Sequence, residues 1–336
     1  MSDTVIVRLP NWLGDTVMAV PAIRALKDAA PSARVVAIGP WSTILSGQGL
    51  ADVLVLYPRD WATRLRLTDT IRDLRGDVVL VLPNSFEAAA AARYWGGRRR
   101  IGFATQGRSW LLTDPVPVPV PRPHQIDEYA CLAGAFGVAV ANRVPRLEPP
   151  APGGDTRSEA RTTLATVGVA ENDDRLVVGI HLGAAYGSAK VWPVAPTVEL
   201  CRRLIADGAI LVLLGPAECG AIAAEITRAS GAVSLVGRDR PAILSAILVE
   251  LGVLVAGDTG IAHLAAALGT PVVTLFGPTD PARSAPRGRA TVIRHPVPCA
   301  PCFYRTCPIE HPCMTSIEAG RVRTAVHEST AMTARA

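Results

Sequence analysis

The chain has 336 residues, too many for one ordinary hydrophobic core, so its length predicts two domains. Hydrophobic residues make up 49% of the sequence but aromatic residues only 5%, so small aliphatic side chains must fill the cores. The net charge is +5, without long basic runs or many aromatic platforms for bases, which argues against a nucleic-acid-binding protein.

Signals that direct a protein to or across a membrane are missing from the sequence. No uninterrupted apolar run of about 18 residues occurs, so we expect no membrane-spanning helix. The first residues lead directly into a predicted strand and lack the basic start and apolar core of a signal peptide. Seven cysteines, an odd number, are consistent with reduced thiols. These features predict a cytoplasmic protein.

The first half of the chain alternates short apolar runs with segments of helical character. Strands are predicted at 4–8, 34–38, 52–56 and 77–82, and helices between the first strand and residue 30 and at 61–75, 85–95 and 126–136. Continuous apolar strands separated by helices are typical of a parallel sheet covered on both faces. Residues 115–123 carry proline at alternate positions, which predicts an edge strand or a polyproline-like crossing.

A segment rich in proline and glycine, residues 145–155, predicts the domain linker. The second half then repeats the alternation, with strands at 176–180, 209–214, 233–235, 253–256 and 272–276 and helices at 197–207, 218–229, 241–251 and 260–268. We therefore expect an α/β protein with two Rossmann-like, doubly wound domains, 1–150 and 151–336. Their ligand sites should lie at the strand carboxyl ends, facing a central cleft.

The segment NWLGDT (11–16) follows the first strand. A carboxylate at this place, on Asp15, could accept a proton from a substrate hydroxyl. Alternatively, Asp15 could cap the following helix. Pro21 complicates a helix that begins so early, because proline removes one intrahelical hydrogen bond. A GxGxxG motif does not follow this strand, which weakens the case for a dinucleotide-dependent dehydrogenase.

The first strand of the second half leads into HLGAAYGSAKVWP (181–193). Small residues such as Gly183 allow backbone amides to approach a phosphate, and Lys190 can supply a positive charge. Lysine occurs only at positions 27 and 190 in this arginine-rich chain, so Lys190 suggests a need for a compact charge. An ordinary exposed lysine is the alternative, and the loop is not a Walker motif.

A third segment, GDTGIAH (257–263), lies between a predicted strand and a predicted helix. Asp258 or Thr259 could simply cap that helix. The amides of Thr259 and Gly260 would also open the helix N-terminus, which is a favourable place for an anion. His263 would lie one turn into the helix, close to that anion. The loop FGPTDP (276–281) after the next strand reads only as a tight turn.

Four cysteines lie within fifteen residues, at Cys299, Cys302, Cys307 and Cys313. Such a cluster could hold zinc, but its spacing lacks the usual paired C-x2-C knuckles. A disulfide is disfavoured in a reducing compartment. Reduced, packed thiols are the leading interpretation.

Four segments together resemble glycosyltransferase family 9, the heptosyltransferases of lipopolysaccharide core assembly, over nearly the whole chain. They are NWLGDTVMAVPAIRALK (11–27), GAAYGSAKVWP (183–193), GDTGIAHLAAALGTPVVTLFGPTDP (257–281) and CAPCFYRTCPIEHPCM (299–314). The third segment is the most specific. The other three look most similar to the heptosyltransferase II branch.

The resemblance implies a GT-B fold, with the acceptor sugar bound by the N-terminal domain and the ADP-sugar by the C-terminal domain. It implies a metal-independent, inverting transfer of a heptose from ADP-heptose, without a cofactor. Asp15 matches the family's candidate general base and Lys190 the cation that faces the diphosphate. The donor-binding positions are Gly183, Lys190, Glu218, Asp258, Thr259, Gly260 and His263, and Glu218 resembles the acidic residue associated with the donor nucleoside.

The implied acceptor is an anionic, lipid-linked inner-core oligosaccharide. We place it at Asn11 and Trp12 and at Arg98, Arg99 and Arg100, because residues 1–150 hold 17 basic and 13 acidic residues. A basic acceptor face would also attract the protein to the inner face of the plasma membrane. Alternatively, the three arginines form a solvated turn.

Two other functions remain open from the sequence. A relative from the same family could use a small-molecule acceptor or another polysaccharide. The chain could also be a non-catalytic protein that binds sugar nucleotides, although the presence of both Asp15 and Lys190 argues against a degenerate site.

Overall fold

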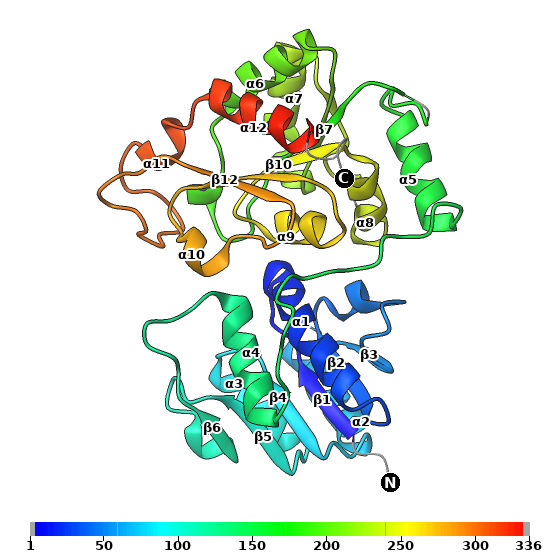
Figure 1. The fold of residues 1–336 in the computed structure, drawn as a ribbon, viewed down its shortest axis with the longest axis vertical. Coiled ribbons are helices and arrows are strands. Elements are labelled where there is room, and N and C mark those ends of the chain that lie inside the picture. The colour runs from blue at the N-terminus through cyan, green and yellow to red at the C-terminus, as the bar shows by residue number, and fades with distance from the viewer. Residues whose placement is uncertain (1–3, 59, 172, 239, 332–336) are drawn as a thin grey trace. The chain divides into compact units, whose positions relative to one another are not determined.

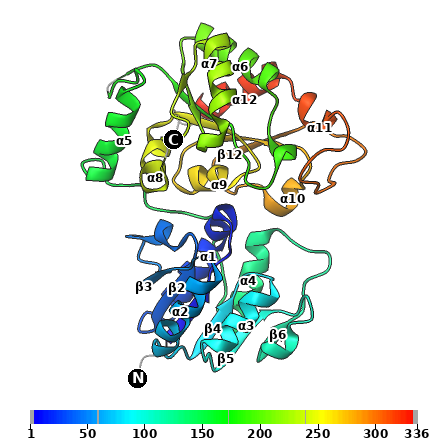
Figure 2. The same cartoon turned by 180° about the vertical axis from the view of Figure 1, so that it is seen from behind.

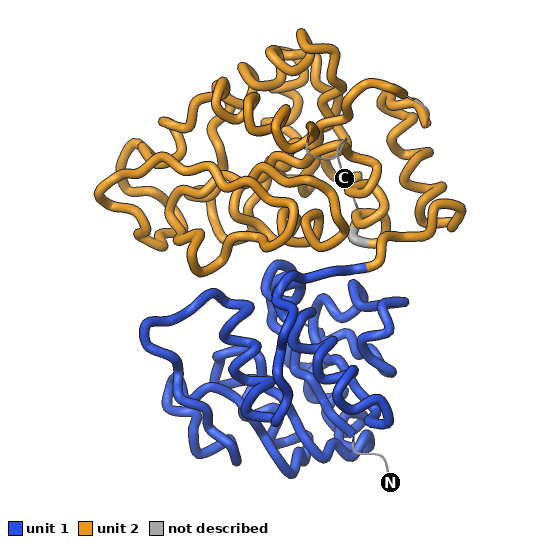
Figure 3. The backbone as a smooth tube through the Cα atoms, viewed as in Figure 1, with its two compact units in different colours: residues 1–147 blue, residues 148–336 orange. Residues whose placement is uncertain are grey.

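The computed structural model describes residues 4–58, 60–171, 173–238 and 240–331 (Figure 1). The chain divides into two compact units, residues 1–147 and residues 148–336 (Figure 3). The division falls inside the predicted linker 145–155, shortly before the predicted boundary at residue 150. Among the described helices, none is both long and apolar enough to cross a membrane.

Unit 1 is a six-stranded parallel sheet covered by helices. Its strands are β1 (Thr4–Arg8), β2 (Arg34–Gly39), β3 (Val53–Leu56), β4 (Val78–Val81), β5 (Arg99–Phe103) and β6 (Asp114–Val116). Its helices are α1 (Leu13–Ala29), α2 (Trp61–Asp73), α3 (Phe86–Tyr94) and α4 (Gln125–Phe136), with single 3-10 turns η1 (Ser42–Leu45) and η2 (Ser109–Leu111). Helices α1 and α4 pack together on one face, and α2 and α3 lie on the other (Figures 1 and 2).

Unit 2 repeats this architecture. Its strands are β7 (Val177–His181), β8 (Ile210–Leu214), β9 (Val233–Ser234), β10 (Val253–Gly257), β11 (Val272–Phe276) and β12 (Ala290–Arg294). Its helices are α5 (Asp155–Ala165), α6 (Val194–Ala206), α7 (Gly220–Ser230), α8 (Pro241–Glu250), α9 (Gly260–Ala267), α10 (Pro281–Ser284), α11 (Pro312–Thr315) and α12 (Ala319–Ala331). Two 3-10 turns, η3 (Ser188–Lys190) and η4 (Ala217–Cys219), follow β7 and β8.

The two sheets have the same topology. The strand order is β3-β2-β1-β4-β5-β6 in unit 1 and β12-β11-β10-β7-β8-β9 in unit 2. When the strands are numbered within each unit, and unit 2 is read from β9 to β12, both orders are 3-2-1-4-5-6. Every strand pair is parallel. This is the doubly wound arrangement that the alternation of strands and helices predicts. Strand β6 lies at the edge of its sheet, where the prolines that follow it remove no central hydrogen bond.

Two strands and four helices, among them the one-turn helices α10 and α11, were not predicted from the sequence. Strand β5 begins with two arginines and buries only its last three residues. Because of this charged start, the sequence pattern indicated a turn and not a strand. Strand β12 is largely exposed, α5 begins inside the predicted linker, and α12 is mostly polar. In each case the apolar pattern is too weak to identify the element without its neighbours.

Pro21 does not end α1, which continues to Ala29. Residues 16–23 are all buried, so this helix packs along its middle on nearly every side. A proline inside a helix costs about 3 kcal/mol. Burial of this many apolar side chains outweighs that cost.

Candidate functional site

The topology places the predicted motifs at the carboxyl ends of central strands, where the strand order reverses. Because all strands of a sheet are parallel, their carboxyl ends share one edge. The strand order reverses between β1 and β4 in unit 1 and between β7 and β10 in unit 2. Open α/β sheets bind ligands outside the carboxyl ends of strands at such a switch point. Asp15 follows β1, Lys190 follows β7 and Asp258 follows β10, so each lies at a switch point.

In unit 2 the structure brings Lys190 and Asp258 together. The Lys190 Nζ lies 2.5 Å from the Asp258 Oδ2, and the two side chains are only 12% and 6% exposed. The hydroxyl of Thr279, from the turn after β11, donates to the same carboxylate oxygen at 2.7 Å. A small pocket beside this pair is lined by the ends of β7 and β10 and by Trp192. The turn 276–281 thus contributes a polar group to the site.

The other predicted donor residues lie on the connections after β7, β8 and β10. The side chain of Thr259, the residue before α9, makes no capping hydrogen bond, and α9 opens at Gly260. His263 is buried one turn into α9. Glu218 is exposed in η4, after β8. A Cβ at Gly183 would lie 2.8 Å from the Pro216 ring, so glycine allows the loops after β7 and β8 to pack together.

In unit 1, Trp12 is the residue before α1 and Asp15 lies in the first turn. Asp15 is therefore not the capping residue of this helix. Its charge acts on the buried Tyr129 of α4, whose pKa is raised first by burial and then by Asp15. Trp12 is 48% exposed, so its indole is open to a ligand.

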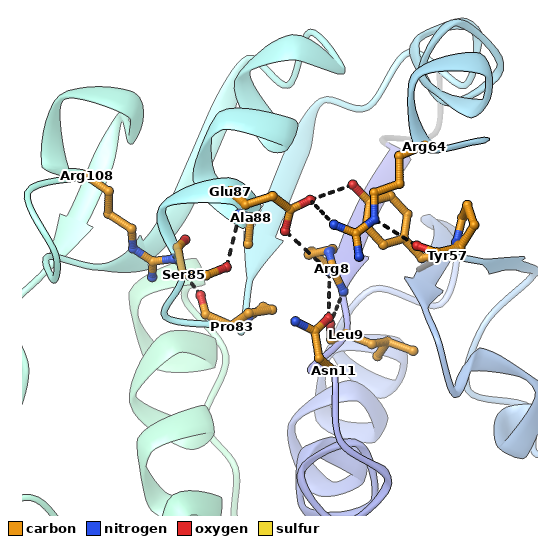
Figure 4. Close-up of polar contacts among 11 residues, drawn as sticks. Arg8, Leu9, Asn11, Tyr57, Arg64, Pro83, Ser85, Glu87, Ala88 and Arg108 are labelled. Carbon is orange, nitrogen blue, oxygen red and sulfur yellow. Dashed lines mark hydrogen bonds and ion pairs between the residues drawn. The ribbon is translucent and has the colours of Figure 1, made fainter. Parts of the chain in front are cut away.

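Arg8, at the carboxyl end of β1, anchors the segment that carries these residues (Figure 4). The side chain is fully buried, which lowers its pKa, and Glu87 partly offsets this effect. One terminal nitrogen of Arg8 donates to the Asn11 Oδ1 at 2.8 Å and lies 3.8 Å from a Glu87 oxygen. Asn11 is thus fixed by Arg8.

A second arginine and a tyrosine complete this cluster. The Tyr57 hydroxyl donates to Glu87 at 2.7 Å, and Arg64 lies 3.6 Å from the same carboxylate oxygen. The guanidinium carbons of Arg8 and Arg64 lie 4.3 Å and 4.9 Å from the centre of the Tyr57 ring, a distance typical of cation–π contacts. Two guanidinium groups therefore share one carboxylate, which leaves an excess positive charge beside Asn11.

Sequence reasoning missed this cluster of Arg8, Tyr57, Arg64 and Glu87. One signal was present: the apolar strand TVIVR ends in a charged residue at the edge where ligands bind. The partners of Arg8 follow β3 and β4, so only the strand order shows that they meet it.

Arg98, Arg99 and Arg100 lie elsewhere. Arg99 and Arg100 begin β5 and Arg98 precedes it, at the amino-terminal edge of the sheet, whereas Asn11 and Trp12 follow a carboxyl end. Arg98 pairs with Asp77, and Arg99 lies 2.8 Å from Asp114. Arg100 donates to the carbonyl groups of Gly97 and Leu111. The structure therefore does not bring these arginines together with the rest of the predicted acceptor site.

The four clustered cysteines are all free thiols. Burial raises the pKa of Cys313, and Cys299, Cys302 and Cys307 raise it further. Within the described ranges, no group of three or more histidine, cysteine or acidic side chains is arranged to hold a metal ion. Only Cys313 of the four is buried, and Cys299 is exposed, so the expectation of packed thiols applies to Cys313 alone.

His181, at the end of β7, lines the pocket beside Lys190. Burial lowers its pKa to about 4, while a backbone hydrogen bond at Gly183 acts weakly in the opposite direction. The imidazole is therefore neutral at physiological pH.

This pKa predicts how the stability of unit 2 depends on pH. The unfolded chain takes up a proton at His181 near pH 6.5, whereas the folded chain resists protonation down to about pH 4. The contribution of the neutral His181 to the unfolding free energy is therefore fully present above pH 6.5. It is lost as the pH falls toward 4, by up to about 3 kcal/mol. Urea unfolding should show a smaller loss for His181→Gln than for the wild type. His295 is exposed, so His295→Gln is the matched control. An equal dependence of the unfolding free energy on pH in all three proteins would contradict the assignment.

With the site geometry established, comparisons with known proteins identify the family. The sequence matches glycosyltransferase family 9 (heptosyltransferase) over residues 64–312. It is 29% identical to lipopolysaccharide heptosyltransferase 2 of Salmonella typhimurium over 303 residues, 85% of this chain and 86% of that protein. It is 28% identical to lipooligosaccharide heptosyltransferase 2 of Haemophilus influenzae over 305 residues, with the same shares.

A solved structure agrees with these matches. The structure of E. coli ADP-heptose LPS heptosyltransferase II matches 99% of this chain and 100% of its own, with a TM-score of 0.81 and 26% identity. The two parallel six-stranded sheets with flanking helices are thus a GT-B fold, as expected from the sequence. The chain is a glycosyltransferase and belongs to glycosyltransferase family 9.

Proposed function

We propose that this enzyme transfers a heptose from ADP-heptose to an inner-core acceptor of lipopolysaccharide, with inversion and without a metal ion. The observation that carries the proposal is the convergence of Lys190, Asp258 and the start of α9 at the switch point of unit 2. A cation and a helix N-terminus at one place suit a diphosphate. The heptosyltransferase 2 relatives and the E. coli structure named for ADP-heptose support this choice of donor and acceptor.

In the proposed reaction, the Asp15 carboxylate accepts the proton of the acceptor hydroxyl. The hydroxyl oxygen forms a bond to the anomeric carbon while the bond from that carbon to the diphosphate oxygen breaks. Attack from the face opposite the leaving group inverts the anomeric centre. ADP departs with the electron pair of the broken bond, and Lys190 and the amides of the first turn of α9 stabilise its growing charge.

One prediction tests the proposed general base. Asp15→Asn should leave folding and ADP affinity unchanged but lower turnover about 100-fold or more, because the amide cannot accept the proton. The rate of ADP release in the presence of acceptor measures this effect.

A control variant lies on the same helix. Asp28 is exposed in the last turn of α1, so Asp28→Asn should retain full activity. Turnover of Asp15→Asn close to that of Asp28→Asn would remove Asp15 from the mechanism.

Another prediction concerns Lys190. Lys190→Ala should weaken ADP binding and also slow transfer, because the charge of the leaving group is greatest in the transition state. Part of the loss will come from Asp258, whose buried carboxylate is left without its counter-charge. Calorimetry with ADP and steady-state kinetics separate the two effects.

The double variant Lys190→Ala/Asp258→Asn restores neutrality without the cation. If Lys190 contacts the diphosphate, the double variant stays impaired, whereas recovery would mean that the ion pair is only structural. Chelation by EDTA should not change the wild-type rate. Strict dependence on a divalent ion would contradict the metal-free mechanism.

For the acceptor, we propose the carboxyl edge of the unit 1 sheet. Large exposed aromatic side chains follow four of its strands: Trp12 after β1, Trp61 after β3, Phe86 after β4 and Trp110 after β5. Aromatic faces offer rigid, amphipathic contact area that suits sugar rings. The excess positive charge of Arg8 and Arg64 lies at the same edge and favours an anionic acceptor. A lipid-linked acceptor would bring this edge to a membrane surface.

This assignment predicts different effects for arginines at the two edges of the sheet. Arg64→Gln should raise the acceptor KM and leave the ADP-heptose KM unchanged, because it removes the more accessible cation of the cluster. Arg98→Gln, at the amino-terminal edge, should change neither. Initial rates with a purified inner-core acceptor measure both values. An acceptor KM raised by Arg98→Gln alone would return the acceptor site to the start of β5.

A further inference from the structure

The charge balance of the proposed donor site is incomplete without a further cation. Lys190 and Asp258 form a close pair, so together they carry no net charge. The diphosphate of a sugar nucleotide is an anion, and its charge increases when ADP leaves. The start of α9 supplies partial charge only.

The cysteine-containing segment 299–313 packs directly against the loop that follows β7 and carries Lys190, called here the Lys190 loop (182–193). The Ala189 amide donates to the Arg305 carbonyl at 3.0 Å, and the His311 Nε2 lies 2.7 Å from the Ala189 carbonyl oxygen. The Tyr186 hydroxyl donates to the Phe303 carbonyl. These contacts fix the segment beside Lys190 although more than a hundred residues separate the two in sequence.

Gly187 shows how closely the two backbones approach. It adopts a φ of 150°, and a Cβ at this position would lie 2.3 Å from the Arg305 carbonyl oxygen. Only glycine allows this approach. The backbone position of Arg305 is therefore determined by the loop that carries Lys190.

The side chain of Arg305 lies beside the same aromatic ring as Lys190. The Tyr186 ring centre is 4.6 Å from the Lys190 Nζ and 5.4 Å from the Arg305 guanidinium carbon. The two cations are thus within about 10 Å of each other. Arg305 is exposed, and no acidic side chain among the described residues pairs with it. Its positive charge is therefore not balanced by a carboxylate among the described residues, whereas that of Lys190 is balanced by Asp258.

We infer that Arg305 is a second diphosphate-binding cation of the donor site, presented by the cysteine-containing segment. The inference rests on the proposed function, because it assigns Arg305 to the diphosphate of the same sugar nucleotide. A guanidinium group can donate two parallel hydrogen bonds to phosphate oxygens. Arg305 would act on one part of the diphosphate while Lys190 acts on the other.

Calorimetry on the full chain tests this inference with Arg305→Gln. The variant should weaken ADP binding about tenfold, the usual scale for a lost charge-assisted hydrogen bond, and leave adenosine binding unchanged. It should also lower kcat at saturating ADP-heptose, since the cation stabilises the departing diphosphate. Arg305→Lys should recover part of the ADP affinity. At about 1 M salt the difference between wild type and Arg305→Gln should shrink.

Arg228→Gln is the matched control. Arg228 is an exposed arginine on α7 for which the structure shows no acidic partner among the described residues, so its removal changes the net charge equally. It should bind ADP like the wild type. Equal weakening by both variants would show a general charge effect and overturn the assignment.

The remaining outcomes separate the inference from the function on which it rests. If the wild type neither binds ADP nor transfers a sugar, the proposed function fails. If the wild type binds ADP and Arg305→Gln binds it equally well, only the role of Arg305 fails. An increase in the acceptor KM alone would assign Arg305 to an anionic group of the acceptor and overturn its place on the diphosphate.

Discussion

Parallel pairing of every strand is the constraint on which the rest of this structure depends. It sends all carboxyl ends of a sheet to one edge, so residues far apart in sequence become neighbours there without any contact in the core. The reversal of strand order then leaves one gap between outgoing connections in each unit. Lys190 and Asp258 meet at such a gap, and so do Arg8 and Glu87.

The two units solve the same electrostatic problem in different ways. Each places a basic side chain after its first strand or at the end of it, and each balances that charge with a carboxylate from the connection after the neighbouring central strand. In unit 2 the pair is close, at 2.5 Å, and the Thr279 hydroxyl donates to the same carboxylate oxygen. In unit 1 the pair is 3.8 Å apart, and Tyr57 bridges the carboxylate and two guanidinium groups. In unit 1 two guanidinium groups therefore share one carboxylate, which leaves surplus positive charge at that switch point.

The sequence predicts those elements and site residues that a short stretch of chain identifies by itself. Central strands such as β1 and β11 are short, apolar and bounded by turns, so they were predicted within a residue or two. Asp15, Lys190 and Asp258 were chosen as candidates from the sequence, and each lies on the connection that follows such a strand. The Arg8 cluster and the place of Arg98 needed the strand order, which no local pattern encodes. To place Arg305, the strand order alone is not enough. The contact with Tyr186, which lies on a different connection of the sheet, is also required.

The backbone contact between Gly187 and Arg305 has a consequence for how the protein is made. During synthesis the Lys190 loop leaves the ribosome long before residues 303–311, so its final neighbour does not yet exist. Strands β7, β8 and β10 can pair as they emerge, yet the loop above them stays without the carbonyl that its Ala189 amide binds. Contacts between such distant segments form late in folding. The strands β7, β8 and β10 of the nascent enzyme are therefore synthesised well before the segment that completes the contacts of the loop carrying Lys190.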